Sequence, residues 1–421
     1  MKTFIIEKWL NLALINLCVL ALLGVTLRYK ITFSLPLINQ QNLLHGHSHF
    51  AFSGWVSQAL MTLLVFYLQK TKQESVIKRY SWLLFTNILF SYGMLIFFTI
   101  QGYAFFSILF STLCIFVSYI FTIMYWKDLN KLKLKCNSHL WFKAALLFNV
   151  ISSVGPFILA YMMFNKHLDQ NTYLLSVYYY LHFQYNGWFI FACMGLFVSK
   201  FNEIIGNDKK LNTIFWIFAF SSIPTYFMAV LWFKIPVALY LLVIVAAIME
   251  VVAWLWFIRI IRNAISELKK SISYPARLLM TLAAISMSIK VILQLGSAYM
   301  PLNQLVFGFR PIVIGYLHLV FLGIISIFIL GYFVSERMLI INKTTKTGIG
   351  LFVFGVFINE LFLMAQGITG LIGERFPYIN VLLFIAAIVI FTGILILVIN
   401  NIRTHLLNKT EPVPPIIMLP E

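Results

Sequence analysis

Long apolar stretches separated by short polar and charged segments dominate the hydropathy pattern of this chain. Each holds about 20 residues, enough for an α-helix to cross a hydrocarbon layer of about 30 Å. Twelve are expected as transmembrane helices, near residues 10–27, 46–68, 81–101, 103–126, 142–164, 173–199, 213–232, 235–258, 277–300, 310–333, 348–370 and 378–400. The pattern predicts an all-α polytopic membrane protein with a single membrane domain, residues 1–421. The tightest turns are expected at Gln101-Gly102 and Lys234-Ile235-Pro236.

The composition supports this prediction and argues against several classes of function. Of the 421 residues, 61% are hydrophobic and 10% are charged, which is more apolar surface than a soluble core can hide. The net charge of +18 comes from short loops between apolar stretches, so membrane lipid is the expected partner and nucleic acid is not. The four cysteines lack paired spacing, so neither a disulfide framework nor a thiolate metal site is expected. The first apolar segment lacks a small-residue cleavage site and is expected to be a retained helix.

Lysine and arginine are distributed unevenly between alternate loops. With a cytoplasmic N-terminus, the inside segments hold 23 of the 31 basic residues, the outside segments hold 6, and Lys143 and Lys290 lie within helices. This is the positive-inside bias of membrane proteins. It predicts a multi-pass protein of the inner (cytoplasmic) cell membrane with both termini cytoplasmic.

A histidine motif recurs along the chain at a nearly constant interval. The segment from Leu44 to Trp55 holds three histidines, His45, His47 and His49. Its core is His49-x4-Gly54-Trp55, which returns as His182-x4-Gly187-Trp188 and, in weaker form, as His318-x4-Gly323-Ile324. The three copies fall on helices two, six and ten, which run in the same direction, with the later two histidines roughly 12–14 Å deep. The common depth, direction and period predict a pseudo-threefold (3 × 4) arrangement of twelve helices.

Imidazole is the side chain that this pattern singles out chemically, because it binds haem iron, copper or zinc as a neutral ligand. The alternative is that each histidine hydrogen-bonds a neighbouring helix; the threefold repetition favours metal binding. On a regular helix His45 and His49 share a face while His47 points the other way, so the three cannot bind one centre. The period selects His49 as the buried ligand. His45 and His47 are expected at the outer mouth, as a metal site or as solvated side chains. Gly54 and Gly187 suit close approach of a neighbouring helix.

Twelve helices with histidines in helices two, six and ten resemble the catalytic subunit (subunit I) of the haem-copper oxidase superfamily. That superfamily includes cytochrome c oxidases, quinol oxidases and nitric oxide reductases. The resemblance implies a low-spin haem b between His318 and His49, or alternatively His45 or His47. It also implies that His182 is a ligand of copper or non-haem iron. The family's H-x-H pair on helix ten reads Tyr316-Leu317-His318 here, so Tyr316 stands where the ligand of a high-spin haem would be.

Two further regions are compared with the family pattern. Helix seven lacks the family's His-His pair and reads F-S-S-I-P-T at residues 220–225. A six-coordinate low-spin haem transfers electrons and leaves no open position for oxygen, so ordinary dioxygen reduction is not expected. In the family, outer-loop arginines hold haem propionates, and Arg375 in the stretch G-E-R-F-P matches them. Arg28 and Arg310 also lie at the outside, where guanidinium can bind a carboxylate in bidentate fashion; loop anchoring is the alternative.

Three functional hypotheses follow. The first is a haem-binding integral membrane protein resembling subunit I, with an electron-transfer haem and a degenerate second metal site; whether it is a respiratory oxidoreductase of the terminal oxidase or nitric oxide reductase kind stays open. The second is a non-enzymatic haem- and copper-containing membrane protein of the NnrS type. The third is a proton-coupled transporter using the intramembrane charges Glu250, Lys290 and Glu360, which otherwise form structural pairs. The chain has no c-type haem motif, so its electron donor would be a cytochrome c-like protein or quinol. The sequence does not determine the oligomeric state.

Overall fold

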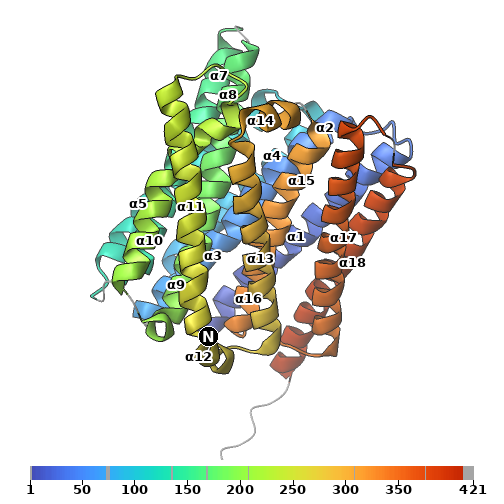
Figure 1. The fold of residues 1–421 in the computed structure, drawn as a ribbon. Helices are drawn as coiled ribbons and strands as arrows, with labels where there is room; N and C mark the ends of the chain where they lie inside the picture. Colours follow the sequence, from blue (N-terminus) through green and yellow to red (C-terminus); the bar gives the residue numbers. More distant parts are fainter. Residues whose placement is uncertain are drawn as a thin grey trace, which may run out of the picture.

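The protein is a bundle of long helices, shown in Figure 1. The structure is a computed structural model that describes residues 2–72, 76–133, 136–166, 169–206, 208–307, 309–374 and 376–410. Within those ranges every regular element is helical. The elements are α1 (Lys2–Thr32), α2 (Gln40–Phe50), η1 (Ala51–Ser57), α3 (Gln58–Lys72), α4 (Ile77–Gln101), α5 (Phe105–Asn130), α6 (Ser138–Ser152), α7 (Val154–Phe164), α8 (Gln170–His182), η2 (Phe183–Phe189), α9 (Ile190–Ile205), α10 (Asp208–Ser221), η3 (Pro224–Val230), α11 (Val237–Asn263), α12 (Ile265–Ser271), α13 (Tyr274–Ser297), α14 (Met300–Phe307), α15 (Arg310–His318), η4 (Leu319–Ser326), α16 (Ile327–Ser335), α17 (Lys343–Leu371) and α18 (Ile379–Thr410).

The membrane spans confirm the prediction of a polytopic helical protein. In the described residues, eleven helices are long and apolar enough to cross a membrane, and the count reaches 12 if one bent pair forms a single span. That pair, Lys209–Ser221 and Pro224–Val230, bends by 40° where the seventh span was predicted. Proline at the first position of η3 removes an amide donor and accounts for the break. The expected tight turns are also present: α4 ends at Gln101 before Gly102 (φ 64°), and α11 begins after Pro236.

A π-helical segment accompanies each copy of the repeated motif, and the sequence analysis did not anticipate it. His182 is the last residue of α8 before η2, and His318 is the last residue of α15 before η4. His49 lies one residue further back, because Phe50 ends α2 before η1. Such segments carry an extra residue per turn and are rare, often occurring at functional sites. The sequence repeat is therefore also a repeat of local backbone structure.

The tryptophans of the motif join the three copies to one another. Trp55 of η1 donates its indole N–H to the Ser326 hydroxyl of η4 at 2.9 Å. Trp188 of η2 donates to the Ser57 hydroxyl of η1 at 3.1 Å. Ser57 and Ser326 occupy the same position in their copies, two residues after Trp55 and Ile324 respectively. Gly-Trp and Gly-Ile in this repeat therefore serve the packing of the three spans against each other.

The motif glycines lie at close contacts. A Cβ added to Gly187 would lie 2.5 Å from the Cβ of Phe148 on α6, so glycine is needed for this approach, as predicted. At Gly54 the added Cβ would instead meet the ring of Phe50, one turn earlier on the same span, at 2.5 Å. The Gly54 carbonyl accepts a hydrogen bond from Asn16 of α1. The first glycine thus leaves room for a ring of its own span, and the second leaves room for a neighbouring helix.

The order in which the spans pack recurs along the chain. Each π segment contacts the span before it: η1 contacts α1, η2 contacts α6 and η4 contacts α13. In each set the following helices then pack on one another in turn. In the first set α2 contacts α4 and α4 contacts α5; in the second α8 contacts η3 and α10 contacts α11; in the third α15 contacts α17 and α17 contacts α18. Between these sets, α5 packs on α6, α11 packs on α13, and α18 packs on α1. The last span therefore lies beside the first.

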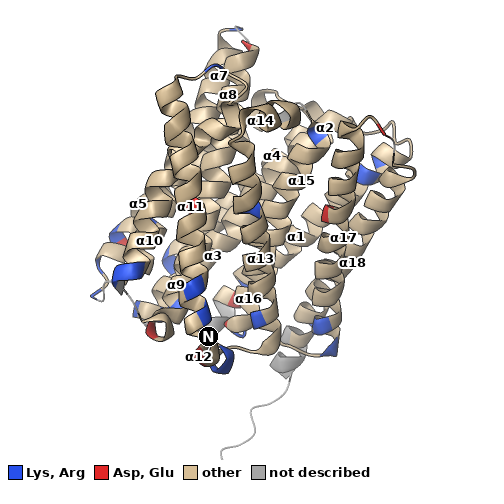
Figure 2. Ribbon diagram, in the orientation of Figure 1, with Lys and Arg blue, Asp and Glu red and all other residues tan. Residues whose placement is uncertain are grey.

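Charged side chains gather at the end of the bundle where the N-terminus lies, as Figure 2 shows. Two buried carboxylates organise part of this end. Asp128 at the end of α5 accepts hydrogen bonds from Tyr80, Arg79 and Lys72 at 2.7, 3.0 and 3.4 Å. Glu336 pairs with Lys70 and Lys200, which lie near the ends of the first and second histidine-bearing spans. These ion pairs join the ends of neighbouring spans.

Candidate functional site

Three of the histidines lie on α2, whose start is set by a local cap. The Asn39 side chain accepts hydrogen bonds from the backbone N–H groups of Gln41 and Asn42, which satisfies donors that a helix start leaves unpaired. The span begins earlier than its predicted start at residue 46, so His49 lies a full turn or more inside it. At 3.6 residues per turn, this helix sends His45 and His49 to one side and His47 to the other.

His45 and His49 form one cluster with α4 and the turn after it. The His49 ring stacks on Phe98, with centroids 4.1 Å apart and planes 7° apart. Its Nε2 lies 3.3 Å from the Tyr103 hydroxyl, and the His45 ring meets the Tyr103 ring edge-on at 4.7 Å. The shared face predicted for these two histidines is confirmed, and the contacts found on that face are aromatic.

His47 points toward α1 and α15 instead. Its Cε1 atom would lie 3.7 Å from a Cβ placed on Gly24 of α1, and its ring interacts with the Leu20 carbonyl of the same helix. His47 is also close enough to His318 and Arg28 for direct electrostatic interaction. Its Nδ1 atom is buried and has no hydrogen-bond partner among the described residues. His318 therefore interacts electrostatically with His47, the alternative that the sequence left open, whereas His49 interacts with His45 on the other side of α2.

His318 has the hydrogen-bonding pattern of a metal ligand. Its Nδ1 lies 2.8 Å from the Ile314 carbonyl one turn earlier. A carbonyl can only accept, so Nδ1 carries the proton and the Nε2 atom of the neutral ring keeps its lone pair. Histidines that bind metals usually donate their other ring N–H to a carbonyl or carboxylate in this way, which fixes the tautomer and orientation.

Charged groups surround the His47–His318 pair on one side. Arg28 of α1 interacts electrostatically with both histidines and with Glu360 of α17. Glu360 accepts a hydrogen bond from the Asn359 amide at 3.1 Å. Arg310, predicted to hold a propionate, is exposed at the first position of α15. Arg375, predicted to do the same, lies outside the described residues. Arg28 is therefore the arginine that the structure places beside the histidine pair.

His182 uses both of its ring nitrogens within the protein. Its Nε2 donates to the Ser222 carbonyl at 2.8 Å, so in the neutral ring Nδ1 is an acceptor. That atom accepts from the Asn186 side-chain amide at 3.1 Å. No lone pair is left over, and a metal would have to displace Asn186. In the part of the chain that the structure describes, no group of three or more His, Cys, Asp or Glu side chains is placed to hold a metal ion.

Glu250 and Lys290 lie in a second buried polar cluster. The Glu250 carboxylate of α11 accepts from Thr225 at 3.1 Å and from Gln294 at 2.8 Å. Lys290 of α13 interacts electrostatically with Glu250 and with His182. Glu250 is thus hydrogen-bonded within the protein and interacts electrostatically with Lys290, in line with the structural alternative. Asn186, Thr225 and Gln294 were missed from the sequence, because single amides and hydroxyls in apolar helices follow no spacing rule.

His139 lies in a different kind of element from the one that the sequence predicts. His139 falls in a predicted loop, but in the structure it is the second residue of α6 and is buried. Its Nε2 lies 2.7 Å from the Tyr67 hydroxyl on α3. This prediction was wrong because the helix of the fifth apolar stretch, expected from residue 142, begins earlier, at Ser138, where Tyr67 supplies a partner for the imidazole.

The side chains present are of the kinds that hold a haem through two imidazoles. Low-spin haem iron takes two axial ligands, and neutral imidazole is one of the usual ones. His318 presents a free Nε2, while its neighbour His47 has a buried ring nitrogen without a partner. Arg28 beside them has the guanidinium that binds carboxylates such as propionates. A search of protein-family models and of curated proteins finds no match to this chain.

Proposed function

We propose that this chain is a haem-binding integral membrane protein in which a haem b held by His47 and His318 transfers electrons. The observation that carries the proposal is the Nδ1 hydrogen bond of His318 to the Ile314 carbonyl, which leaves Nε2 free on a histidine that interacts electrostatically with His47. A bound haem supplies one-electron redox chemistry. The protein's own contribution is two neutral imidazoles, a guanidinium that balances propionate charge, and apolar spans that exclude water.

A catalytic second metal centre is not part of this proposal. The copper or non-haem iron expected at His182 stays a prediction, and the two hydrogen bonds of the His182 ring work against it. Because both ring nitrogens of His182 are hydrogen-bonded, the second hypothesis, a non-enzymatic haem membrane protein of the NnrS type, is favoured over a terminal oxidase or nitric oxide reductase. Oxygen and nitric oxide consumption at full haem occupancy separates them: turnover with an electron donor identifies an enzyme, and its absence a non-enzymatic protein.

The architecture proposed for this function has three units of four spans related by a pseudo-threefold axis. Support comes from the three π segments, from the Trp55–Ser326 and Trp188–Ser57 hydrogen bonds between copies, and from the recurring order of neighbours. In the proposed orientation both termini lie on the cytoplasmic side of the inner membrane. The basic side chains at the N-terminal end of the bundle support this orientation.

Absorption spectroscopy on the purified protein tests the haem proposal. Protein from haem-replete cells should show a reduced-minus-oxidised difference spectrum with a sharp low-spin α-band. His47→Ala and His318→Ala should each lose most of this band, because each removes one of two axial ligands. His49→Ala is the matched control, since it truncates an imidazole two residues away on the same helix, and it should keep the band. A colourless wild-type protein, or loss of the band in His49→Ala alone, would contradict the assignment.

A further inference from the structure

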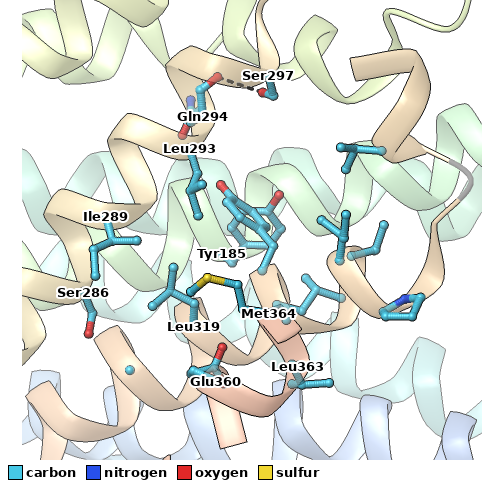
Figure 3. Close-up of a pocket in the computed structure, with 18 of the residues that line it drawn as sticks. Tyr185, Ser286, Ile289, Leu293, Gln294, Ser297, Leu319, Glu360, Leu363 and Met364 are labelled. Carbon is cyan, nitrogen blue, oxygen red and sulfur yellow. Dashed lines mark hydrogen bonds between the residues drawn. The ribbon is translucent and has the colours of Figure 1, made fainter. Parts of the chain in front are cut away.

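A large cavity opens among helices from the middle and last thirds of the chain. Its volume is about 820 Å³, and its walls come from α8, η2, η3, α13, α14, α15, η4, α16 and α17. In Figure 3, Ile289, Leu293 and Gln294 of α13 and Glu360 and Met364 of α17 line it. Most of the surface is apolar, with a few amide, hydroxyl and carboxyl groups. This composition is typical of sites for small organic ligands, which are mostly apolar with few placed polar groups.

The cavity is open sideways, toward the lipid. Leu293 of α13 is 50% exposed, and Phe357 and Met364 of α17 are 64% and 58% exposed, yet all three line the cavity. Side chains that face both the cavity and the outer surface of a membrane-spanning bundle mark an opening to the hydrocarbon layer. A molecule that reaches this cavity by that route must be soluble in the bilayer.

Two buried amide oxygens in the cavity wall have no donor. The first belongs to Asn186, whose Nδ2 must face His182, because the Nδ1 of that neutral ring can only accept. This leaves the Asn186 Oδ1 atom, which is buried and has no hydrogen-bond partner in the described residues. Asn186 is 7% exposed and lines the cavity.

Gln294 repeats this arrangement on the other wall. Its Nε2 donates to the Glu250 carboxylate at 2.8 Å, so its Oε1 atom is the free end of the amide. That oxygen is also buried and lacks a partner among the described residues, while the side chain is 6% exposed. A buried acceptor without a donor is costly, about 1–3 kcal/mol. Both oxygens therefore call for a ligand that donates hydrogen bonds.

Aromatic rings form another part of the wall. Tyr185 and Tyr316 line the cavity with centroids 6.2 Å apart and planes at 71°. Such rings pack favourably against a flat aromatic ligand. Bilayer solubility, hydroxyl donors and a flat ring together describe one chemical class.

We propose that this cavity binds a membrane-soluble hydroquinone, whose hydroxyl groups donate to the amide oxygens of Asn186 and Gln294 and whose apolar tail leaves between α13 and α17. A phospholipid acyl chain would fill the volume but has no donor for either oxygen. Binding is independent of haem; only a role of the ligand as electron donor rests on the proposed function.

Ligand partition into nanodiscs tests the proposal. The full-length protein is titrated under argon with a decyl-tailed hydroquinone and, separately, with its dimethyl ether, and binding to empty nanodiscs is subtracted. The ether keeps the ring and tail and loses both donors. The hydroquinone should bind about tenfold or more tightly than the ether, as expected for buried hydrogen bonds. Equal binding of the two compounds would overturn the proposal.

Two variants with matched geometry locate the site. Leu293→Trp places an indole in the opening. Ile292→Trp adds the same side chain at the preceding position of α13, and Ile292 is 64% exposed and does not line the cavity. Hydroquinone affinity should fall about tenfold or more in the first variant and stay within about twofold of wild type in the second. Equal affinities of the two variants, or a phospholipid that copurifies and is not displaced by the hydroquinone, would reject the site. Because neither variant removes a buried hydrogen bond, both are expected to fold.

Discussion

The hydrogen bond between Trp55 and Ser326 is the most direct test of how the repeated segments meet. Both side chains are 1% exposed, and the indole N–H lies 2.9 Å from the hydroxyl oxygen. Ser326 in turn donates to the Phe321 carbonyl of its own span at 2.7 Å. Ser326→Ala removes little volume but takes away the acceptor of the indole. The substitution therefore isolates one polar contact between two copies of the motif.

The expected loss can be bounded from two kinds of measurement. Leaving a buried donor unpaired costs about 1–3 kcal/mol, and hydrogen bonds between membrane helices are worth about 0.6 kcal/mol on average and about 1.7 kcal/mol at most. Since the indole is buried with no other acceptor assigned to it, we expect Ser326→Ala to lower the free energy of unfolding by about 1–2 kcal/mol. Trp55→Phe should cost more, because it also removes buried volume. The coupling energy of the pair should be about 0.6–1.7 kcal/mol.

Reversible unfolding by SDS in bicelles measures these energies. Ser118→Ala is the control, because that hydroxyl donates to the Ile115 carbonyl of its own helix, and the change should be close to neutral. Ser57→Ala should repeat the effect of Ser326→Ala, since Ser57 accepts from Trp188 at 3.1 Å. If Ser326→Ala is as stable as Ser118→Ala, and Trp55 and Ser326 show no coupling, the motif does not join the copies as described.

The remaining predictions use the same unfolding measurement. Asp128→Asn should lower the free energy of unfolding by about 2 kcal/mol, because a buried carboxylate with three donors becomes an amide that cannot match them. Glu267→Gln, in an exposed pair with Lys270, should cost less than about 0.5 kcal/mol, and a similar loss in both would contradict this account. Gly187→Ala should cost about 1–3 kcal/mol, since its Cβ would lie 2.5 Å from Phe148. Gly350→Ala has open space and should be neutral or stabilising; equal losses in the two glycine variants would exclude close packing as the cause.

Part of the candidate site could be predicted from helical geometry. The division of α2 into a His45–His49 face and a His47 face follows from 3.6 residues per turn, and the structure confirms it. The choice of His49 as partner of His318 rested on the period of the motif. In the structure the Gly-Trp part of the motif serves packing at the π segments, and the histidine of α2 that interacts electrostatically with His318 is His47. A sequence period marks equivalent positions, and it does not say which neighbouring helix each side chain meets.

The apolar stretches alone determined that this chain spans the membrane many times, roughly where eleven of the spans lie and where the tightest turns fall. These features depend on residue hydrophobicity, helix length and the backbone preferences of Gly102 and Pro236, all of which are local. Tertiary structure alone decided which polar groups meet: His47 with His318, the two nitrogens of His182 with Ser222 and Asn186, and Glu250 with Thr225 and Gln294. Inside a bilayer a polar side chain without a partner is costly. Which partner it finds depends on the rotation of each helix about its axis, and that rotation is set by packing across the whole bundle.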